Sequence, residues 1–122
     1  MAEPERPIDE RVRGVHGYLW DMAKVSLIAK LTAAEGKADE FESALAAMIE
    51  ASNEEAGLEI YSAHRGDDNV YWFFELYSDS DAFAVHGKGD AMKTAMRAIG
   101  AFMGGPPEVS ICAPVVAKGL DI

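Results

Sequence analysis

Residues 58–77 read Leu-Glu-Ile-Tyr-Ser-Ala-His-Arg-Gly-Asp-Asp-Asn-Val-Tyr-Trp-Phe-Phe-Glu-Leu-Tyr, and this stretch decides the fold. Two runs rich in β-branched and aromatic residues, Leu58–Arg65 and Val70–Tyr77, flank a Gly-Asp-Asp-Asn turn, so the stretch predicts a β-hairpin. The two-residue period of a strand gives the second run two faces. One face carries Val70, Trp72, Phe74 and Leu76, and the other carries Tyr71, Phe73, Glu75 and Tyr77. We expect both faces to be at least partly buried.

The chain before the hairpin predicts a strand and then a helix. Lys24–Thr32 is rich in β-branched and apolar residues, which is typical of a strand. After Gly36, apolar side chains recur at three- and four-residue spacing, which indicates a helix with one buried stripe. The members of the stripe are Phe41, Leu45, Met48 and Ile49. We expect Gly57 to end this helix as a left-handed C-terminal cap.

The chain after the hairpin predicts a short helix, a longer helix and a last strand. Ser78 and Asp81 have the spacing of a capping box, so a helical turn is expected from there to His86. After a glycine-rich break, Met92, Met96 and Ile99 make the apolar stripe of the second main helix. We expect the last strand over 109–117, at an edge or a bend because it contains Pro114.

This order, β-α-β-β-α-β, is that of the ferredoxin-like α+β fold, in which one antiparallel sheet carries both helices on one side. The strand Val70–Tyr77 then offers apolar side chains to the uncovered side as well. Burial of that surface is favourable by about 25 cal/mol per Å² of apolar area. We therefore predict a homodimer in which two sheets face each other.

Composition limits the classes of protein that remain. The 122 residues are 49% hydrophobic and 26% charged, which fits one domain, expected over 24–119 behind an N-terminal arm over 1–23. The arm contains side chains that favour docking on the domain: Val15, Tyr18, Leu19 and Trp20. Asp and Glu number 21 against 11 Lys and Arg, a net charge of -10, which argues against nucleic acid as a partner.

Cysteine usage and hydropathy point to a cytoplasmic protein. The single cysteine, Cys112, excludes an internal disulfide framework and a zinc site with several thiolate ligands. The N-terminal residues alternate charges and prolines, unlike a signal peptide. No segment approaches the roughly 20 apolar residues of a membrane-spanning helix, so we expect no membrane association.

Two stretches resemble the antibiotic biosynthesis monooxygenase (ABM) family of dimeric α/β barrels. They are 56–61 and 74–86, and the resemblance extends over about 24–119. The marks are a glycine that ends the first helix with Tyr61 soon after it, Glu75 two residues before an aromatic residue at the end of the third strand, and His86 at the end of the short helix. The resemblance implies the ferredoxin-like fold and its pairing into a dimeric barrel.

Family members that oxidise anthrones imply one set of site residues. Their site histidine and arginine fall on His64 and Arg97. Three other positions differ, because Tyr77 stands in place of a tryptophan, Phe73 in place of an asparagine and Phe83 in place of a tyrosine. The resemblance thus implies catalytic roles for His64, Arg97 and Tyr77. His64 would be the base and Arg97 would neutralise a phenolate or a peroxide, in a slot lined by aromatic rings.

Other family members imply further site residues. Those that oxidise quinols or act on the autoinducer-2 signal share a Glu and a His that fall on Glu75 and His86, although Ala91 replaces a second histidine. Haem-degrading members carry their iron ligand where this chain has Met96, which disfavours haem degradation. Glu75, His86, Phe73, Phe83 and Met96 are therefore the candidates for substrate binding.

Each candidate also has a structural interpretation. His64 is equally consistent with an exposed strand end, Arg97 with a solvated helix residue and His86 with a cap of helix carbonyls. Glu75 lies among aromatic residues and needs a partner, for which Arg97, His86 or a backbone donor are candidates. The methionines are typical core residues.

The resemblance implies a monooxygenase that works without a metal, flavin or other cofactor on a small aromatic, quinol or polyketide-type molecule. An electron-rich phenol can itself reduce oxygen once it is deprotonated, so the protein needs to bind a flat ring and assist proton loss. Two alternatives stay open. One is a non-catalytic dimeric barrel that binds a ligand or acts in stress, and the other is an isomerase of a small carbonyl compound.

Overall fold

A computed structural model describes residues 23–122 of the chain. Nearly all of the expected arm, including its docking side chains Val15, Tyr18, Leu19 and Trp20, lies outside the described residues. The elements are, in chain order, β1 (Val25–Thr32), α3 (Ala38–Ser52), β2 (Leu58–Arg65), β3 (Val70–Tyr77), α4 (Ser80–Val85), α5 (Asp90–Gly100) and β4 (Glu108–Cys112). This is the predicted α+β order, with the short helix α4 before α5.

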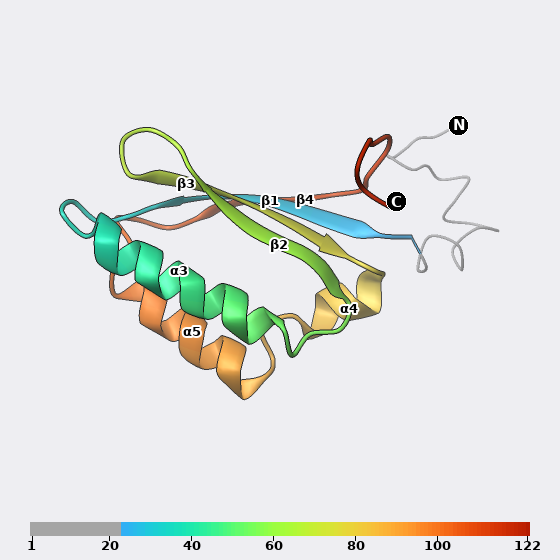
Figure 1. The fold of residues 1–122 in the computed structure, drawn as a ribbon, viewed down its shortest axis with the longest axis horizontal. Coiled ribbons are helices and arrows are strands. Elements are labelled where there is room, and N and C mark those ends of the chain that lie inside the picture. Colours follow the sequence, from blue (N-terminus) through green and yellow to red (C-terminus); the bar gives the residue numbers. More distant parts are fainter. Residues whose placement is uncertain (1–22) are drawn as a thin grey trace.

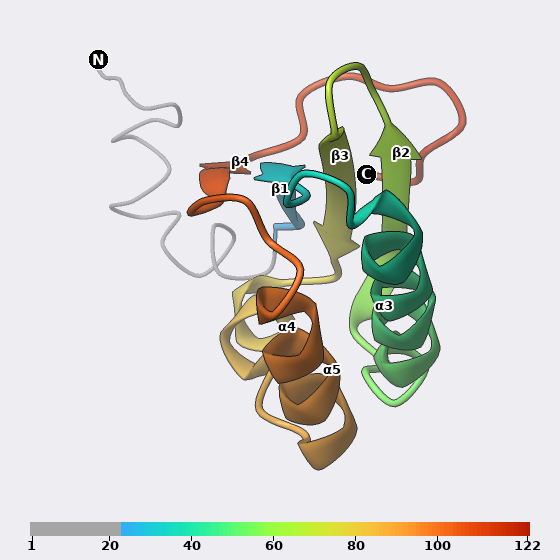
Figure 2. The ribbon, with the colours of Figure 1, turned by 90° about the vertical axis from the view of Figure 1, so that its left-hand side faces the viewer.

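The four strands form one antiparallel sheet in the order β2-β3-β1-β4. The three helices within residues 23–122 lie on one side of it, with α3 and α5 side by side (Figure 1, Figure 2). We call this side of the sheet the helix face and the opposite side the outer face. The predicted ferredoxin-like architecture is therefore confirmed.

The predicted alternation of β3 is confirmed as well. The side chains of its odd-numbered positions 71–77 are buried on the helix face. On the outer face, Trp72 is 45% exposed and Ile28 of the neighbouring strand β1 is 44% exposed. Strand β3 thus presents a polar and aromatic face to the helices and an apolar face on the other side.

The core lies between the sheet and the helices. Phe41 of α3 is 0% exposed, and its ring centroid lies 4.7 Å from that of Tyr71. At the outer end of this contact, the Glu42 carboxylate accepts hydrogen bonds from the Tyr71 hydroxyl at 2.6 Å and from Nε of Arg65 at 2.7 Å. These bonds join α3 to strands β2 and β3.

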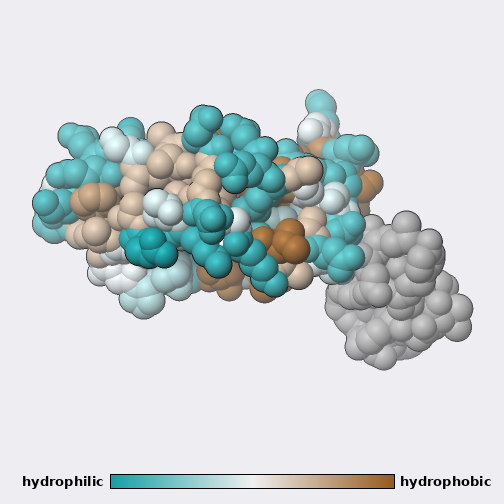
Figure 3. Space-filling model, turned by 90° about the horizontal axis from the view of Figure 1, so that it is seen from below, coloured by the Kyte–Doolittle hydropathy of each residue, from teal (hydrophilic) through white to brown (hydrophobic). Residues whose placement is uncertain are grey.

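The solvent side of α3 carries acidic charge. Its exposed side chains include Asp39, Glu40 and Glu50. Seen from the helix side, the surface is largely hydrophilic with scattered apolar patches (Figure 3). No helix within residues 23–122 is long and apolar enough to cross a membrane.

The hairpin turn has the predicted geometry, but the end of α3 differs from the prediction. Asp68 and Asn69 have φ of 55° and 66°, the left-handed geometry that a tight turn favours. The prediction of Gly57 as a left-handed cap is wrong, because α3 already ends at Ser52 and its C-cap, Asn53, has φ of -64°. Gly57 instead allows close packing: a Cβ there would lie 2.4 Å from the Cβ of Ala82 in α4.

Two other boundaries differ from the prediction. The N-cap of α4 is Asp79, whose Oδ1 accepts a hydrogen bond from the backbone N–H of Ala82 at 2.8 Å. The capping residue is therefore one position later than the predicted Ser78. Strand β4 ends at Cys112 instead of extending to Ala117, because its pairing with β1 stops where β1 begins.

Candidate active site

A buried carboxyl group lies on the helix face of β3. Glu75 is 6% exposed, and its Oε1 accepts a short hydrogen bond from the hydroxyl of Tyr77, which is 0% exposed. Burial raises the pKa of Glu75, although the Tyr77 hydrogen bond and the nearby His86 oppose this. Burial and the bond to Glu75 raise the pKa of Tyr77, so its hydroxyl keeps its proton and acts as a donor.

His86 reaches this carboxyl from the end of α4. Its Nε2 lies 3.8 Å from Oε1 of Glu75, and its Nδ1 lies 2.7 Å from Oε1 of Glu55. Glu55 stands between α3 and β2, where the chain turns back toward the sheet. We call Glu55, His86, Glu75 and Tyr77 the polar chain.

Aromatic rings surround the polar chain and hold it in place. Tyr77 packs edge-on against Phe83 of α4 at 5.2 Å, and the His86 ring lies 5.5 Å from Tyr77 and 5.6 Å from Tyr61. Phe73 packs against Tyr61 at 5.6 Å. Burial, reinforced by the charges of Glu75 and Glu55, raises the pKa of Tyr61.

Met96 of α5 comes close to the same place. A Cβ on Gly87, the residue after His86, would lie 3.2 Å from Cε of Met96. Gly87 has φ of 82°, a conformation that favours glycine and turns the chain sharply after His86. The structure therefore gathers all five residues expected to bind substrate around one part of the helix face.

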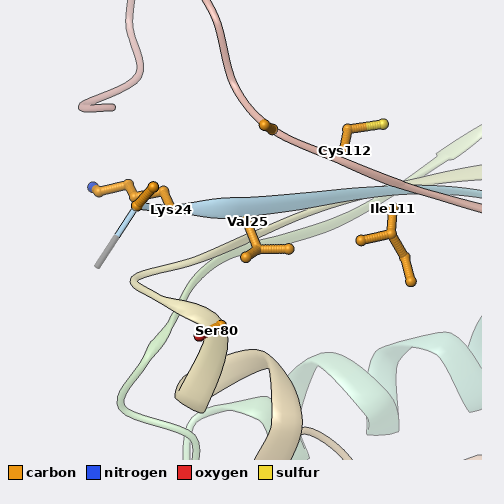
Figure 4. Close-up of a pocket in the computed structure, with 7 residues that line it drawn as sticks. Lys24, Val25, Ser80, Ile111 and Cys112 are labelled. Atoms are coloured by element: carbon orange, nitrogen blue, oxygen red, sulfur yellow. The ribbon is translucent and has the colours of Figure 1, made fainter. Parts of the chain in front are cut away.

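A pocket of about 360 Å³ lies beside this group, between the edge of the sheet and α4. Val25 and Ile111 point from β1 and β4 to the side on which α4 lies, and Ser80 is at the start of α4 (Figure 4). Most of the lining is apolar. Its full set is Ala23, Lys24, Val25, Ser80, Ile111, Cys112 and Ala113.

The strand register relates the pocket to the polar chain. Val25 is the partner of Tyr77, and Leu27 pairs with both Glu75 and Ile111. Neighbouring strands lie about 4.8 Å apart, so the Ile111 backbone is roughly 10 Å from that of Glu75 on the same face. The pocket therefore adjoins the strand pair that carries Tyr77 and Glu75, although neither of these side chains is part of its lining.

The three residues expected to be catalytic do not lie together in the structure of one protein molecule. Tyr77 belongs to the polar chain, whereas His64 is exposed on the outer face, where it pairs with Trp72 and has Nε2 3.0 Å from Oγ of Ser62. Arg97 is exposed on α5. The alternation of β2 explains the position of His64, because the even-numbered positions from Ile60 onward face away from the helices. Catalytic roles for His64 and Arg97 stay predictions.

Glu75 has two partners, Tyr77 and His86. Of these, His86 was among the candidates predicted from the sequence. Sequence reasoning missed Glu55, because it lies in an acidic run that is typical of a solvated helix face. Tyr61 was noted as a family mark without a role. No sequence spacing connects Glu55 with His86, 31 residues later, so only the fold could reveal their contact.

Among residues 23–122, no group of three or more His, Cys, Asp or Glu side chains is arranged to hold a metal ion. The polar chain alternates carboxyl groups with one imidazole and ends in a phenol. Such an arrangement can take a proton from a bound molecule, move it and donate a hydrogen bond to the resulting anion.

Comparison with known proteins identifies the family. The model of the antibiotic biosynthesis monooxygenase family matches residues 24–98. Comparison with curated proteins found no match. Among solved structures, a Caulobacter crescentus protein assigned to this family is 30% identical with a TM-score of 0.74, over 84% of this chain and 99% of its own.

Two further structures resemble the chain. SnoaB from Streptomyces nogalater, described as a cofactor-independent oxygenase, is 20% identical with a TM-score of 0.69, over 80% of this chain and 98% of its own. A Pseudomonas aeruginosa protein is 26% identical with a TM-score of 0.68, over 79% and 98%. The likeness to SnoaB shows a shared fold. The chain belongs to the antibiotic biosynthesis monooxygenase family.

Proposed function

We propose that the protein is a cofactor-independent monooxygenase that acts on a small flat phenol, quinol or polyketide-type molecule. The observation that carries the proposal is the Glu75 carboxyl, which is buried on the helix face, accepts a hydrogen bond from Tyr77 and faces His86. The family and the description of SnoaB as a cofactor-independent oxygenase support it as an analogy.

The chemistry follows from the protonation of these groups. A carboxyl whose pKa is raised toward neutral pH is a better general base than an ordinary one, so Glu75 suits the removal of a proton from a ring hydroxyl or an activated methylene. Tyr77 keeps its proton and can donate a hydrogen bond to the anion that forms. The anion then supplies the electrons that reduce oxygen. For a ring methylene, one oxygen atom becomes a carbonyl group and the other leaves as water.

The pocket supports the proposed class of substrate. Val25 and Ile111 give it apolar walls. Val25 pairs across the sheet with Tyr77, on which Phe83 packs. A charged polyanion would meet an apolar lining in a protein with a net charge of -10. A neutral aromatic molecule with one ionisable hydroxyl group fits these surroundings better.

Oxygen consumption tests the proposal. Wild type is incubated with a panel of anthrones, quinols and naphthols, and oxygen uptake is compared with that of Glu75→Gln and Tyr77→Phe. We expect the loss of a general base in Glu75→Gln to lower turnover by about 10²-fold or more. His64→Ala and Arg97→Ala are measured beside them, because catalytic roles are predicted for both residues although their side chains are exposed away from the polar chain.

Four outcomes would contradict the proposal. Full activity of Glu75→Gln would show that Glu75 is not the base. Loss of activity in His64→Ala and Arg97→Ala alone would assign the chemistry to those two residues instead. Ligand binding that quenches Trp fluorescence without oxygen uptake by any panel member would favour a non-catalytic binding protein. Turnover of a carbonyl compound under anaerobic conditions would favour an isomerase.

We also propose that the protein forms a homodimer through its outer face. Trp72 and Ile28 are nearly half exposed there on neighbouring strands, which is unusual for large apolar side chains in a sheet. Size-exclusion chromatography with light scattering should give twice the 13.2 kDa mass of the chain at micromolar concentration. A monomer mass under these conditions would contradict the dimer.

A further inference from the structure

Glu55 contacts both His86 and the residue that follows it. Its Oε1 lies 2.7 Å from Nδ1 of the imidazole, and its Oε2 accepts a hydrogen bond from the backbone N–H of Gly87 at 3.3 Å. Both side chains are nearly buried, with 11% of Glu55 and 13% of His86 exposed. One carboxylate therefore fixes both the ring and the backbone that follows it.

This contact decides which ring nitrogen carries the proton in neutral His86. A carboxylate oxygen accepts hydrogen bonds, so Nδ1 must be the protonated nitrogen. Nε2 is then left with a free lone pair on the side of Glu75, at 3.8 Å from Oε1. That distance is longer than a hydrogen bond, so roughly 1 Å of movement would close it.

The Glu55 side chain also borders a solvent-accessible pocket. A pocket of about 370 Å³ opens where α3, β2, α4 and α5 meet, and Glu55 is part of its lining together with Gly57, Leu58, Ala82 and Met92. This pocket is distinct from the one lined by Val25 and Ile111. The polar chain thus runs from a buried carboxyl at Glu75 to a water-accessible one at Glu55, with a single imidazole between them.

We propose that Glu55 is a positioning residue, which holds His86 in its Nδ1–H form so that Nε2 can take the proton of Glu75 and the proton can leave at Glu55. The proposal rests on the proposed function, because it explains how Glu75 is returned to its basic form. The Glu75 proton moves to Nε2 of His86, the Nδ1 proton moves to the Glu55 carboxylate, and Glu55 releases it to water in its pocket. One proton crosses and no electron moves, which leaves His86 with its proton on Nε2. The starting tautomer returns when Nε2 gives that proton, by way of Glu75, to the reduced oxygen formed on the substrate, while Nδ1 takes a proton from Glu55 that Glu55 has drawn from water.

The groups around His86 suit this role. Apart from the two carboxyl groups, the titratable side chains packed on the ring are Tyr61 and Tyr77, at centroid distances of 5.6 and 5.5 Å. Burial raises the pKa of both phenols, so neither competes for the proton that His86 carries. The two tyrosine rings instead confine the imidazole between the carboxyl groups.

The tautomer of His86 can be measured without a substrate. The chain has 3 histidines, so ¹⁵N-histidine labelling gives three imidazole signals, and His86→Gln identifies one of them. Long-range ¹H–¹⁵N spectra, recorded at a pH where the rings are neutral, distinguish the two tautomers. We expect the Nδ1–H form in wild type and in the control Glu54→Leu, which removes the exposed neighbouring carboxylate.

Two substitutions separate positioning from proton transfer. Glu55→Leu removes the acceptor, so the His86 signal should shift toward the Nε2–H form. Glu55→Gln keeps an acceptor oxygen that cannot take up a proton, so the Nδ1–H form should persist while kcat falls by about tenfold or more and KM stays within twofold. Circular dichroism and the unchanged His64 signal verify that both variants are folded.

The results distinguish this inference from the proposed function. An Nε2–H form in wild type, or an unchanged His86 signal in Glu55→Leu, overturns the positioning role even if oxygen uptake is found. Unchanged kcat in Glu55→Gln overturns the proton path. If no panel compound consumes oxygen while the tautomer behaves as expected, the proposed function and the proton path fall and the positioning role stands.

Discussion

The substitution Gly57→Ala should destabilise the protein, although alanine is normally the more favourable residue. The new Cβ would lie 2.4 Å from the Cβ of Ala82, 3.1 Å from Oγ of Ser78 and 3.5 Å from the Cα of Ala82. Carbon atoms in contact prefer about 3.5–4.0 Å, so α4 would have to move away by more than 1 Å. Overpacking of this kind costs about 1–3 kcal/mol.

Thermal unfolding checks this prediction. For a domain of this size, each kcal/mol corresponds to a change in Tm of about 4 °C, so we expect Tm to fall by roughly 4–12 °C. The matched control is Gly100→Ala, where a Cβ at the end of α5 would meet nothing within 4 Å. Alanine in a helix is favoured over glycine by about 0.5–1 kcal/mol, so the control should melt at a slightly higher temperature than wild type.

The same substitution tests how the candidate site is held. Helix α4 carries Phe83 and ends at His86, so a shift of α4 should loosen the packing of Phe83 on Tyr77 and lengthen the contact between His86 and Glu55. If Gly57→Ala and Gly100→Ala raise Tm equally, the close approach of Gly57 to α4 does not exist, and the explanation given for this glycine is wrong.

Three further outcomes follow from the core and its charges. Phe41→Ala should lower the free energy of unfolding by about 3–5 kcal/mol in urea titration, because the side chain is fully buried; a loss below about 1 kcal/mol would contradict its place in the core. The pKa of Glu42 is lowered to about 2 by hydrogen bonds from Arg65 and Tyr71, so Arg65→Ala should raise it toward 4.5 in a carboxyl NMR titration, and an unchanged value would refute the pairing. Burial raises the pKa of Glu75, so its stabilising contribution is complete below the unfolded pKa near 4.5 and is lost as pH rises through the folded value; stability of wild type relative to Glu75→Gln should fall over that range, and parallel pH profiles would contradict the shift.

Sequence reasoning recovered the fold because its signals are local. The two-residue period of β3 and the turn at Asp68 and Asn69 specify the hairpin, and the helix stripes follow from spacing alone. The helix ends were less predictable, because several residues suit a cap and tertiary contacts select among them. Asp79 rather than Ser78 caps α4, and Gly57 serves packing rather than a left-handed turn.

The candidate site was only partly predictable. Glu75 could be inferred to need a partner, because a carboxyl among aromatic residues on a central strand is costly to bury. The contact between His86 and Glu55 depends on where α4 returns to the end of α3, and no short-range pattern encodes that. The catalytic role predicted for His64 stays a prediction, and the sequence did not show that the pleat of β2 turns this side chain to the outer face, beside Trp72.

Strand β3 contributes side chains to both the helix face and the outer face of the sheet. The length of the hairpin loop before it therefore matters to both faces. Insertion of a single residue between Asp68 and Val70 would move every side chain of β3 to the opposite side of the sheet if the pairing with β1 shifted by one position. Glu75 and Tyr77 would then point to solvent or to a second copy, while Trp72 and Phe74 would enter the space between sheet and helices. The proposed dimer and the proposed chemistry would then fail together, so we expect natural variation in loop length to be rarer here than at the other connections of the fold.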